Sequence, residues 1–144
     1  MDFIICMDTL GGNWRQWFYI MRTFVEGVLT MKAFQIFLVV IIIGIVSITA
    51  IVISRYGMNL LPIFFGDMAA LTWPGQFNFD FLCFLLLSGL WLAWRHHFSA
   101  GGILLGLAGV FGGIMLLAPY LLVASFKANG DVKMLLLGRR RAGG

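Results

Sequence analysis

The sequence is short of charge. Ten Lys and Arg and six Asp and Glu make up 11% of its 144 residues, whereas hydrophobic residues make up 61%. A soluble domain carries about twice that charge, and a small core could not hide so much apolar surface. The composition therefore predicts an integral membrane protein.

Cysteine and histidine are too few and too badly spaced for a metal site. Cys6 and Cys83 lie far apart and form no CxxC or other ligand spacing. His96 and His97 are adjacent, so on a helix they would point about 100° apart and could not share one ion. We expect no metal and no cofactor; the two histidines should only add positive charge near Arg95 at low pH.

Catalytic and nucleic-acid-binding patterns are also missing. No GxSxG, Walker, Rossmann or HExxH motif occurs, and GGILLGLAGVFGG (101–113) lacks the Lys and Ser or Thr of a phosphate loop. The cations flank apolar runs or the C-terminus, which is unlike a nucleic-acid patch with exposed aromatics. The sequence predicts a protein that is not an enzyme and whose main partner is the lipid bilayer.

Three apolar runs are long enough to be spanning helices, which predicts an all-α membrane domain over residues 31–144. About 20 residues cross the roughly 30 Å hydrocarbon layer. The first run, 34–53, lies between Lys32 and Arg55; the second, 77–94, follows a Trp-Pro-Gly turn and ends in a tryptophan belt. The third, 102–126, contains Pro119, which should bend it.

Glycines follow one face of the third predicted span. Gly102, Gly106, Gly109 and Gly113 recur at spacings of 4, 3 and 4, which lets another helix backbone approach closely. The pattern marks a packing face without naming its partner. Two alternatives remain open: another helix of the same chain, or self-association.

Two further segments are apolar but do not fit a span. Residues 57–73 are interrupted by Pro62, Gly66 and Asp67, which predicts a short interfacial or re-entrant element between spans 1 and 2. From Trp14 to Leu29, apolar residues at helical spacing oppose Arg15, Arg22 and Glu26, as in an amphipathic surface helix.

The first thirty residues have a competing explanation. Met31-Lys32 before the first apolar run is typical of the start of a membrane protein. Glu26-Gly27-Val28 could be encoded by a ribosome-binding sequence at a suitable distance upstream. On this hypothesis residues 1–30 are upstream sequence read as protein.

Asp80 is the acid at the front of the second apolar run. If Asn78 caps that helix, Asp80 falls in its first turn, where free amides and the helix dipole stabilise a carboxylate. With three spans, Asp80 and Arg55 lie at the same membrane face, which predicts an interfacial ion pair. A proton or cation site near the interface is the functional alternative.

Basic residues cluster toward the C-terminus. Lys127, Lys133, Arg139, Arg140 and Arg141 should contact lipid head groups or set the topology. With three spans and a start at Met31, six cations stand against two, which favours a cytoplasmic C-terminus.

The second run and the chain end resemble a known family. Asp80-Phe81, the Trp-x-Ala-aromatic-basic sequence 91–95, Tyr120 and the Leu-Gly-Arg-Arg end are similar to small multi-pass membrane proteins of bacteria and plants classed as a domain of unknown function. The resemblance covers about 31–141 and implies a multi-pass protein of the bacterial inner membrane. His96 and Gly113 stand where such members carry an acid and a polar residue.

Two functions follow as hypotheses. The first is a small non-enzymatic membrane protein that packs with itself or with a larger membrane complex through the glycine stripe. The second is a minor transporter, channel or ligand-binding subunit that uses Asp80 and the bend at Pro119.

Overall fold

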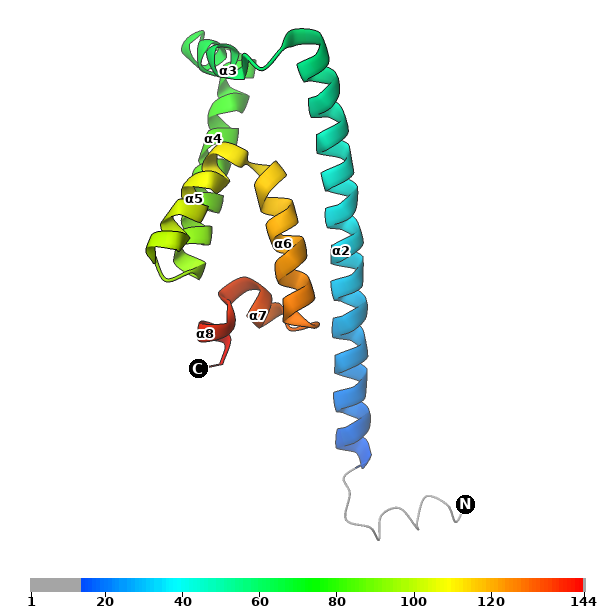
Figure 1. Ribbon diagram of the computed structural model, residues 1–144. Helices are drawn as coiled ribbons and strands as arrows, with labels where there is room; N and C mark the ends of the chain where they lie inside the picture. The colour runs from blue at the N-terminus through cyan, green and yellow to red at the C-terminus, as the bar shows by residue number, and fades with distance from the viewer. Residues whose placement is uncertain (1–13, 144) are drawn as a thin grey trace.

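The computed structural model describes residues 14–143, apart from the side chains of 14–20, 23–26, 28, 139 and 140. Every regular element in this range is a helix. Figure 1 shows a long helix, α2, beside a group of shorter ones. The helices are α2 (Trp14–Tyr56), α3 (Leu60–Ala69), α4 (Trp73–Arg95), α5 (Ala100–Gly112), α6 (Ile114–Ala128), α7 (Val132–Leu137) and α8 (Arg139–Ala142).

Helix α2 contains the first predicted span and continues N-terminally from it. Its 43 residues run without a break from Trp14, so the predicted N-terminal helix and the span share one backbone. The polar and apolar faces predicted for 14–28 lie mostly on side chains outside the described set. Leu29–Tyr56 is long and apolar enough to cross a membrane.

Helices α3 and α4 form a corner after α2. The predicted element between spans 1 and 2 is the ten-residue helix α3. Helix α4 begins at Trp73, four residues before the predicted Phe77, because Pro74 fits the first turn of a helix, where no amide partner is lost. Asn78 is therefore not the cap that we predicted: its amide reaches back to the Phe64 carbonyl and the Asp67 carboxylate, both at 3.3 Å.

The third predicted span is wrong as a single helix. The apolar run is two helices of 13 and 15 residues, α5 and α6, joined at Gly113. Gly113 has φ +53° and ψ −138°, a conformation that suits glycine, and the chain reverses there. Pro119 does not cause the break, because α6 continues through it. At about 20 Å each, neither helix alone matches the roughly 30 Å hydrocarbon layer.

The reversal makes α5 and α6 a hairpin whose two helices pack against different long helices. Helix α5 packs along α4 and α6 packs along α2 (Figure 1). Thr49 in α2 lies 3.9 Å from the Met115 sulfur in α6, whereas Met31 packs with Ala124 and Ala128. Helices α2 and α6 are therefore antiparallel. The hairpin enters and leaves at the end of the molecule where α4 ends.

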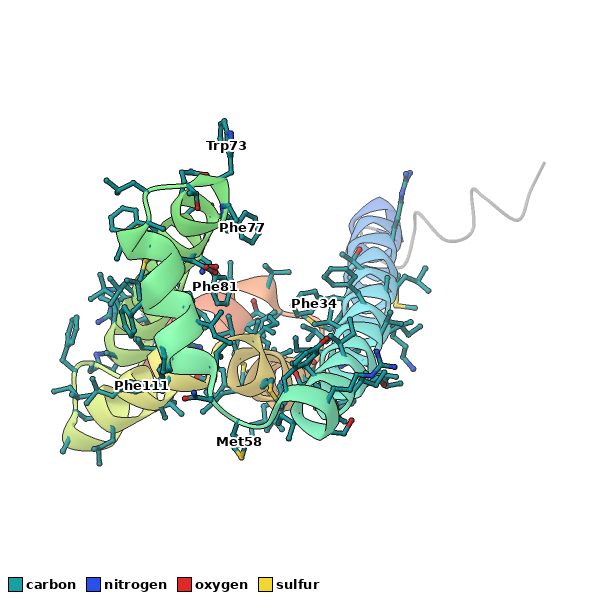
Figure 2. The ribbon with its side chains drawn as sticks, turned by 90° about the horizontal axis from the view of Figure 1, so that it is seen from above. Phe34, Met58, Trp73, Phe77, Phe81 and Phe111 are labelled. Atoms are coloured by element: carbon teal, nitrogen blue, oxygen red, sulfur yellow. The ribbon has the colours of Figure 1, made fainter. Side chains whose placement is uncertain are left out.

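The core is small and lies at that same end. Met31, Ala124, Ala128 and Leu135 are buried together, with Phe34 packed against them. Most large apolar side chains instead point outward, as Figure 2 shows for Trp73 and Phe111, which are 84% and 86% exposed. Among the described residues, two helices are long and apolar enough to cross a membrane, Leu29–Tyr56 and Trp73–Arg95. Only 6% and 17% of the residues in their most apolar 18-residue stretches are buried.

Candidate functional site

The glycine stripe packs within the chain. Gly106 lies so close to α4 that a Cβ added to it would stand 2.6 Å from the Gly89 carbonyl oxygen, and one on Gly109 would meet Leu92. Gly102, Gly106 and Gly109 are buried. Gly113 leaves the stripe to form the turn beside Leu85. The partner of the stripe in this structure is α4.

The end of α4 lies beside the open end of the α5–α6 hairpin, where α5 begins and α6 ends. Ser99 caps α5 by accepting from the Gly102 amide at 3.2 Å, which fixes the short turn after His97. Helix α6 returns to the same level, and Tyr120 meets Arg95 and His96 there. Two segments that are far apart in the sequence, residues 95–102 and the part of α6 around Tyr120, thus converge.

Arg95 is the centre of this cluster. Its Nε donates to the Leu135 carbonyl at 3.0 Å, its Nη2 to the Met134 carbonyl at 3.4 Å, and its Nη1 to the Tyr120 hydroxyl. The guanidinium also lies 5.5 Å from the Tyr120 ring centroid and 6.0 Å from that of Trp91. Arg95 therefore ties α7 to α4 and α6.

His96 shares the Tyr120 hydroxyl with Arg95. Its Nε2 lies 2.8 Å from that oxygen. Because the hydroxyl accepts from Arg95, its own proton is free to be donated to His96, which requires a neutral imidazole protonated on Nδ1. Burial, with the charges of Arg95 and His97, lowers the pKa of His96 below 6.5, in agreement with that neutral form.

A surface cavity of about 480 Å³ opens beside this cluster. Its polar wall comes from Arg95, His96 and Tyr120, and Lys127 stands at the same opening. The remaining wall is apolar: Val123, Ala124 and Met134. A second cavity of about 560 Å³, which includes Lys32 and Ser125 in its lining, lies between α2 and α6. Among the described residues, no group of three or more His, Cys, Asp or Glu could hold a metal ion.

The predicted pair of Arg55 and Asp80 is not joined in the structure. Asp80 lies two turns inside α4, not in its first turn, because the helix starts earlier than predicted. Both side chains are exposed, and among residues 14–143 no hydrogen bond or ion pair is seen between them. The ion pair and the site at Asp80 stay predictions.

The predicted head-group residues lie at the end of the molecule that holds the cavity. Lys127 closes α6 and Lys133 is in α7, and both are exposed. Arg141 stacks on the Trp94 ring at 3.9 Å, so it is held by the protein itself. The side chains of Arg139 and Arg140 lie outside the described set. Asp131 caps α7 through the Met134 amide at 3.1 Å.

No protein-family model, curated protein or solved structure matches this chain. The resemblance to the family of unknown function therefore stays a prediction. The arrangement of Arg95, His96 and Tyr120 has to be interpreted from its own geometry.

Acidification is expected to weaken the fold through His96. The unfolded chain binds a proton at His96 more readily than the folded chain, since the folded pKa is lowered. The stabilisation is complete above about pH 6.5 and is lost as the pH falls from there toward the folded pKa. Arg95, His97 and Tyr120 face His96, and Lys127 lines the same cavity.

Melting temperatures at about pH 7.5 and about pH 5.5 check this expectation. The drop should be smaller in His96→Gln than in the wild type, whereas the matched variant His97→Gln should keep most of the wild-type drop, because the charge of His97 is the smallest of the three causes that lower the pKa of His96. Equal drops in all three proteins would contradict the assignment to His96.

Proposed function

We propose that this chain is a small, non-enzymatic integral membrane protein that spans the bilayer twice and inserts α5 and α6 as a re-entrant hairpin. The observation that carries the proposal is the combination of outward-facing apolar helices with the reversal at Gly113. Bilayer lipid would cover the exposed faces of α2 and α4, which the chain itself leaves open. Along α5 and α6 the backbone is hydrogen-bonded within each helix, as the membrane interior requires.

Charge distribution supports two spans over three. Arg55 is at the end of α2 near α3, whereas Lys32, Arg95, Lys127 and Lys133 lie in or next to residues that pack near the ends of α4 and α6. Acids Asp67 and Asp80 belong to the Arg55 half. The positive-inside rule then favours both flanks of the domain on the cytoplasmic side. On the family resemblance, we assign it to a bacterial inner membrane.

Its role, in this proposal, is to pack with copies of itself or with a larger membrane complex. The glycine stripe is engaged by α4, so assembly would use a different surface from the one predicted from the sequence. Helix α2 offers such a surface, because many of its large apolar side chains are exposed, among them Ile36, Val40 and Ile51. The proposal of a non-enzymatic role rests on the missing catalytic motifs.

Cysteine accessibility tests the topology. In a protein without Cys6 and Cys83, single cysteines replace Met58, His97 or Lys133, all exposed positions in or beside turns. A membrane-impermeant thiol reagent is applied to intact cells and to inverted vesicles. We expect Lys133→Cys and His97→Cys to react from one side and Met58→Cys from the other.

Three spans predict a different result. Lys133→Cys would then react from the side of Met58→Cys and opposite to His97→Cys. That outcome would overturn the re-entrant hairpin. Reaction of all three cysteines from one and the same side would overturn membrane spanning itself.

A further inference from the structure

Arg95 carries a positive charge that no described acid neutralises. Arg95 is only partly exposed, and its guanidinium bonds two carbonyls and a hydroxyl, all of them neutral groups. No ion pair to Arg95 is present among the side chains described. A partly desolvated charge is costly unless an opposite charge compensates it. A bound anion would therefore stabilise this site electrostatically.

Arg95 also retains donors for such an anion. A guanidinium has five N–H groups in a planar fork. One each on Nε, Nη1 and Nη2 is used in the bonds to Leu135, Tyr120 and Met134. This leaves one N–H on each terminal nitrogen. The remaining pair is the kind of donor that binds phosphate oxygens well.

Lys127 supplies a second cation to the lining of the cavity. Tyr120, Val123, Ala124 and Lys127 follow the 3, 4 and 7 spacing of one helix face, and all four line the cavity. Lys127 is exposed and forms no ion pair with any described acid. The cavity lining thus contains a cation on α4 and a cation on α6. On α6, the apolar residues Val123 and Ala124 lie between Tyr120 and Lys127.

We propose that this cavity binds a phosphate group between Arg95 and Lys127, and that the phosphate is carried by the head group of an anionic phospholipid. The phosphate would compensate the Arg95 charge through its free N–H groups, with Lys127 as a point charge. Val123, Ala124 and Met134 form an apolar wall that suits the attached acyl chain and is of no use to a free ion. The location at the cationic end of the helices fits the depth of head groups.

The lipid source rests on the proposed membrane location, whereas the phosphate site does not. A free phosphate ion would use the same two cations. The experiment therefore compares a phospholipid with inorganic phosphate. It also separates a specific cavity from general attraction of lipid to a basic surface.

The test uses the purified, delipidated full chain in detergent. Phosphatidylglycerol and phosphatidylcholine with identical acyl chains are titrated, and bound lipid is counted by native mass spectrometry. We expect a preference for phosphatidylglycerol in the wild type. Lys127→Gln should weaken its binding about fivefold, while Lys133→Gln, which removes the same charge outside the cavity, should stay within about twofold.

One further variant and one further ligand make the result decisive. Lys127→Arg should keep the binding, because it retains the cation. Inorganic phosphate, followed by calorimetry, should bind the wild type far more weakly than the lipid does. Phosphate binding that depends on Lys127 in the absence of any lipid preference would support the phosphate site and exclude lipid as its source.

Two outcomes would overturn the proposal. One is the absence of both phosphate and phosphatidylglycerol binding to a wild-type protein that melts cooperatively. The other is an equal loss in Lys127→Gln and Lys133→Gln, which would show surface attraction only. Neither outcome depends on the topology measured with the cysteine variants, so failure of the site and failure of the membrane proposal can be told apart.

Discussion

Gly106→Ala is expected to destabilise the fold by about 2 kcal/mol, a typical cost of overpacking a close contact. The added methyl group would stand 2.6 Å from the Gly89 carbonyl oxygen and 3.2 Å from the Ala93 side chain. Backbone atoms of α4 cannot move aside as a flexible side chain can. Helices α4 and α5 would have to separate, and thermal unfolding in one detergent measures the loss.

Gly101→Ala is the matched control, five residues earlier in the same helix. A Cβ at Gly101 meets nothing within 4 Å. We expect its stability to stay level or to rise by up to about 1 kcal/mol, as for glycine replaced within a helix. Equal effects of the two substitutions would contradict the packing of α5 on α4.

The same variant separates packing within the chain from assembly through the glycine stripe. If the stripe joined two copies, Gly106→Ala would lower the oligomer fraction and leave the monomer as stable as the wild type. If it packs on α4, the monomer itself loses stability. Unfolding and crosslinking of one sample distinguish the two results.

Arg95→Met is expected to release α7 from the rest of the structure. It keeps an apolar stem but removes the donors to the Leu135 and Met134 carbonyls and to the Tyr120 hydroxyl. Bonds from a charged donor contribute about 1.5–3 kcal/mol each, which outweighs the relief of removing an unneutralised charge. Local opening of α7 should become at least tenfold more frequent, since about 1.4 kcal/mol is a factor of ten.

The rate of trypsin cleavage measures this opening, because Lys133 lies inside α7. Cleavage after Lys133 should speed up at least tenfold in Arg95→Met when opening is faster than cleavage. Arg55→Met, an exposed arginine at the far end of α2, should leave the rate unchanged. An unchanged rate in Arg95→Met would mean that α7 is held by its apolar contacts alone.

Local patterns predicted the helices well and their ends less well. The run 34–53 is inside α2 and the run 77–94 is inside α4, since a long apolar stretch has few alternatives to a helix. The start of α4 was misplaced because Trp73-Pro74-Gly75 resembles a turn and Asn78 resembles a cap in the sequence, whereas residues 73–75 form the first turn of the helix. In the structure its amide reaches across to α3, a contact that sequence spacing cannot show.

The candidate site was only partly visible in the sequence. Arg95, His96 and Tyr120 were noted separately, as a flanking cation, an interfacial histidine and part of a family resemblance. Tyr120 is 24 residues from His96, and a straight third span would carry it most of the way across the bilayer. Only the reversal at Gly113 brings it back.

Composition and hydropathy by themselves determined that the chain is helical, highly apolar and asymmetric in charge, because these depend on residue type and short spacings. The tertiary structure decided how many helices are long enough to span, what the glycine stripe touches, and where Arg95 finds its partners. Gly112-Gly113 within an apolar run permits both a straight helix and a turn. The choice depends on α4 and α2, which offer separate surfaces to α5 and α6.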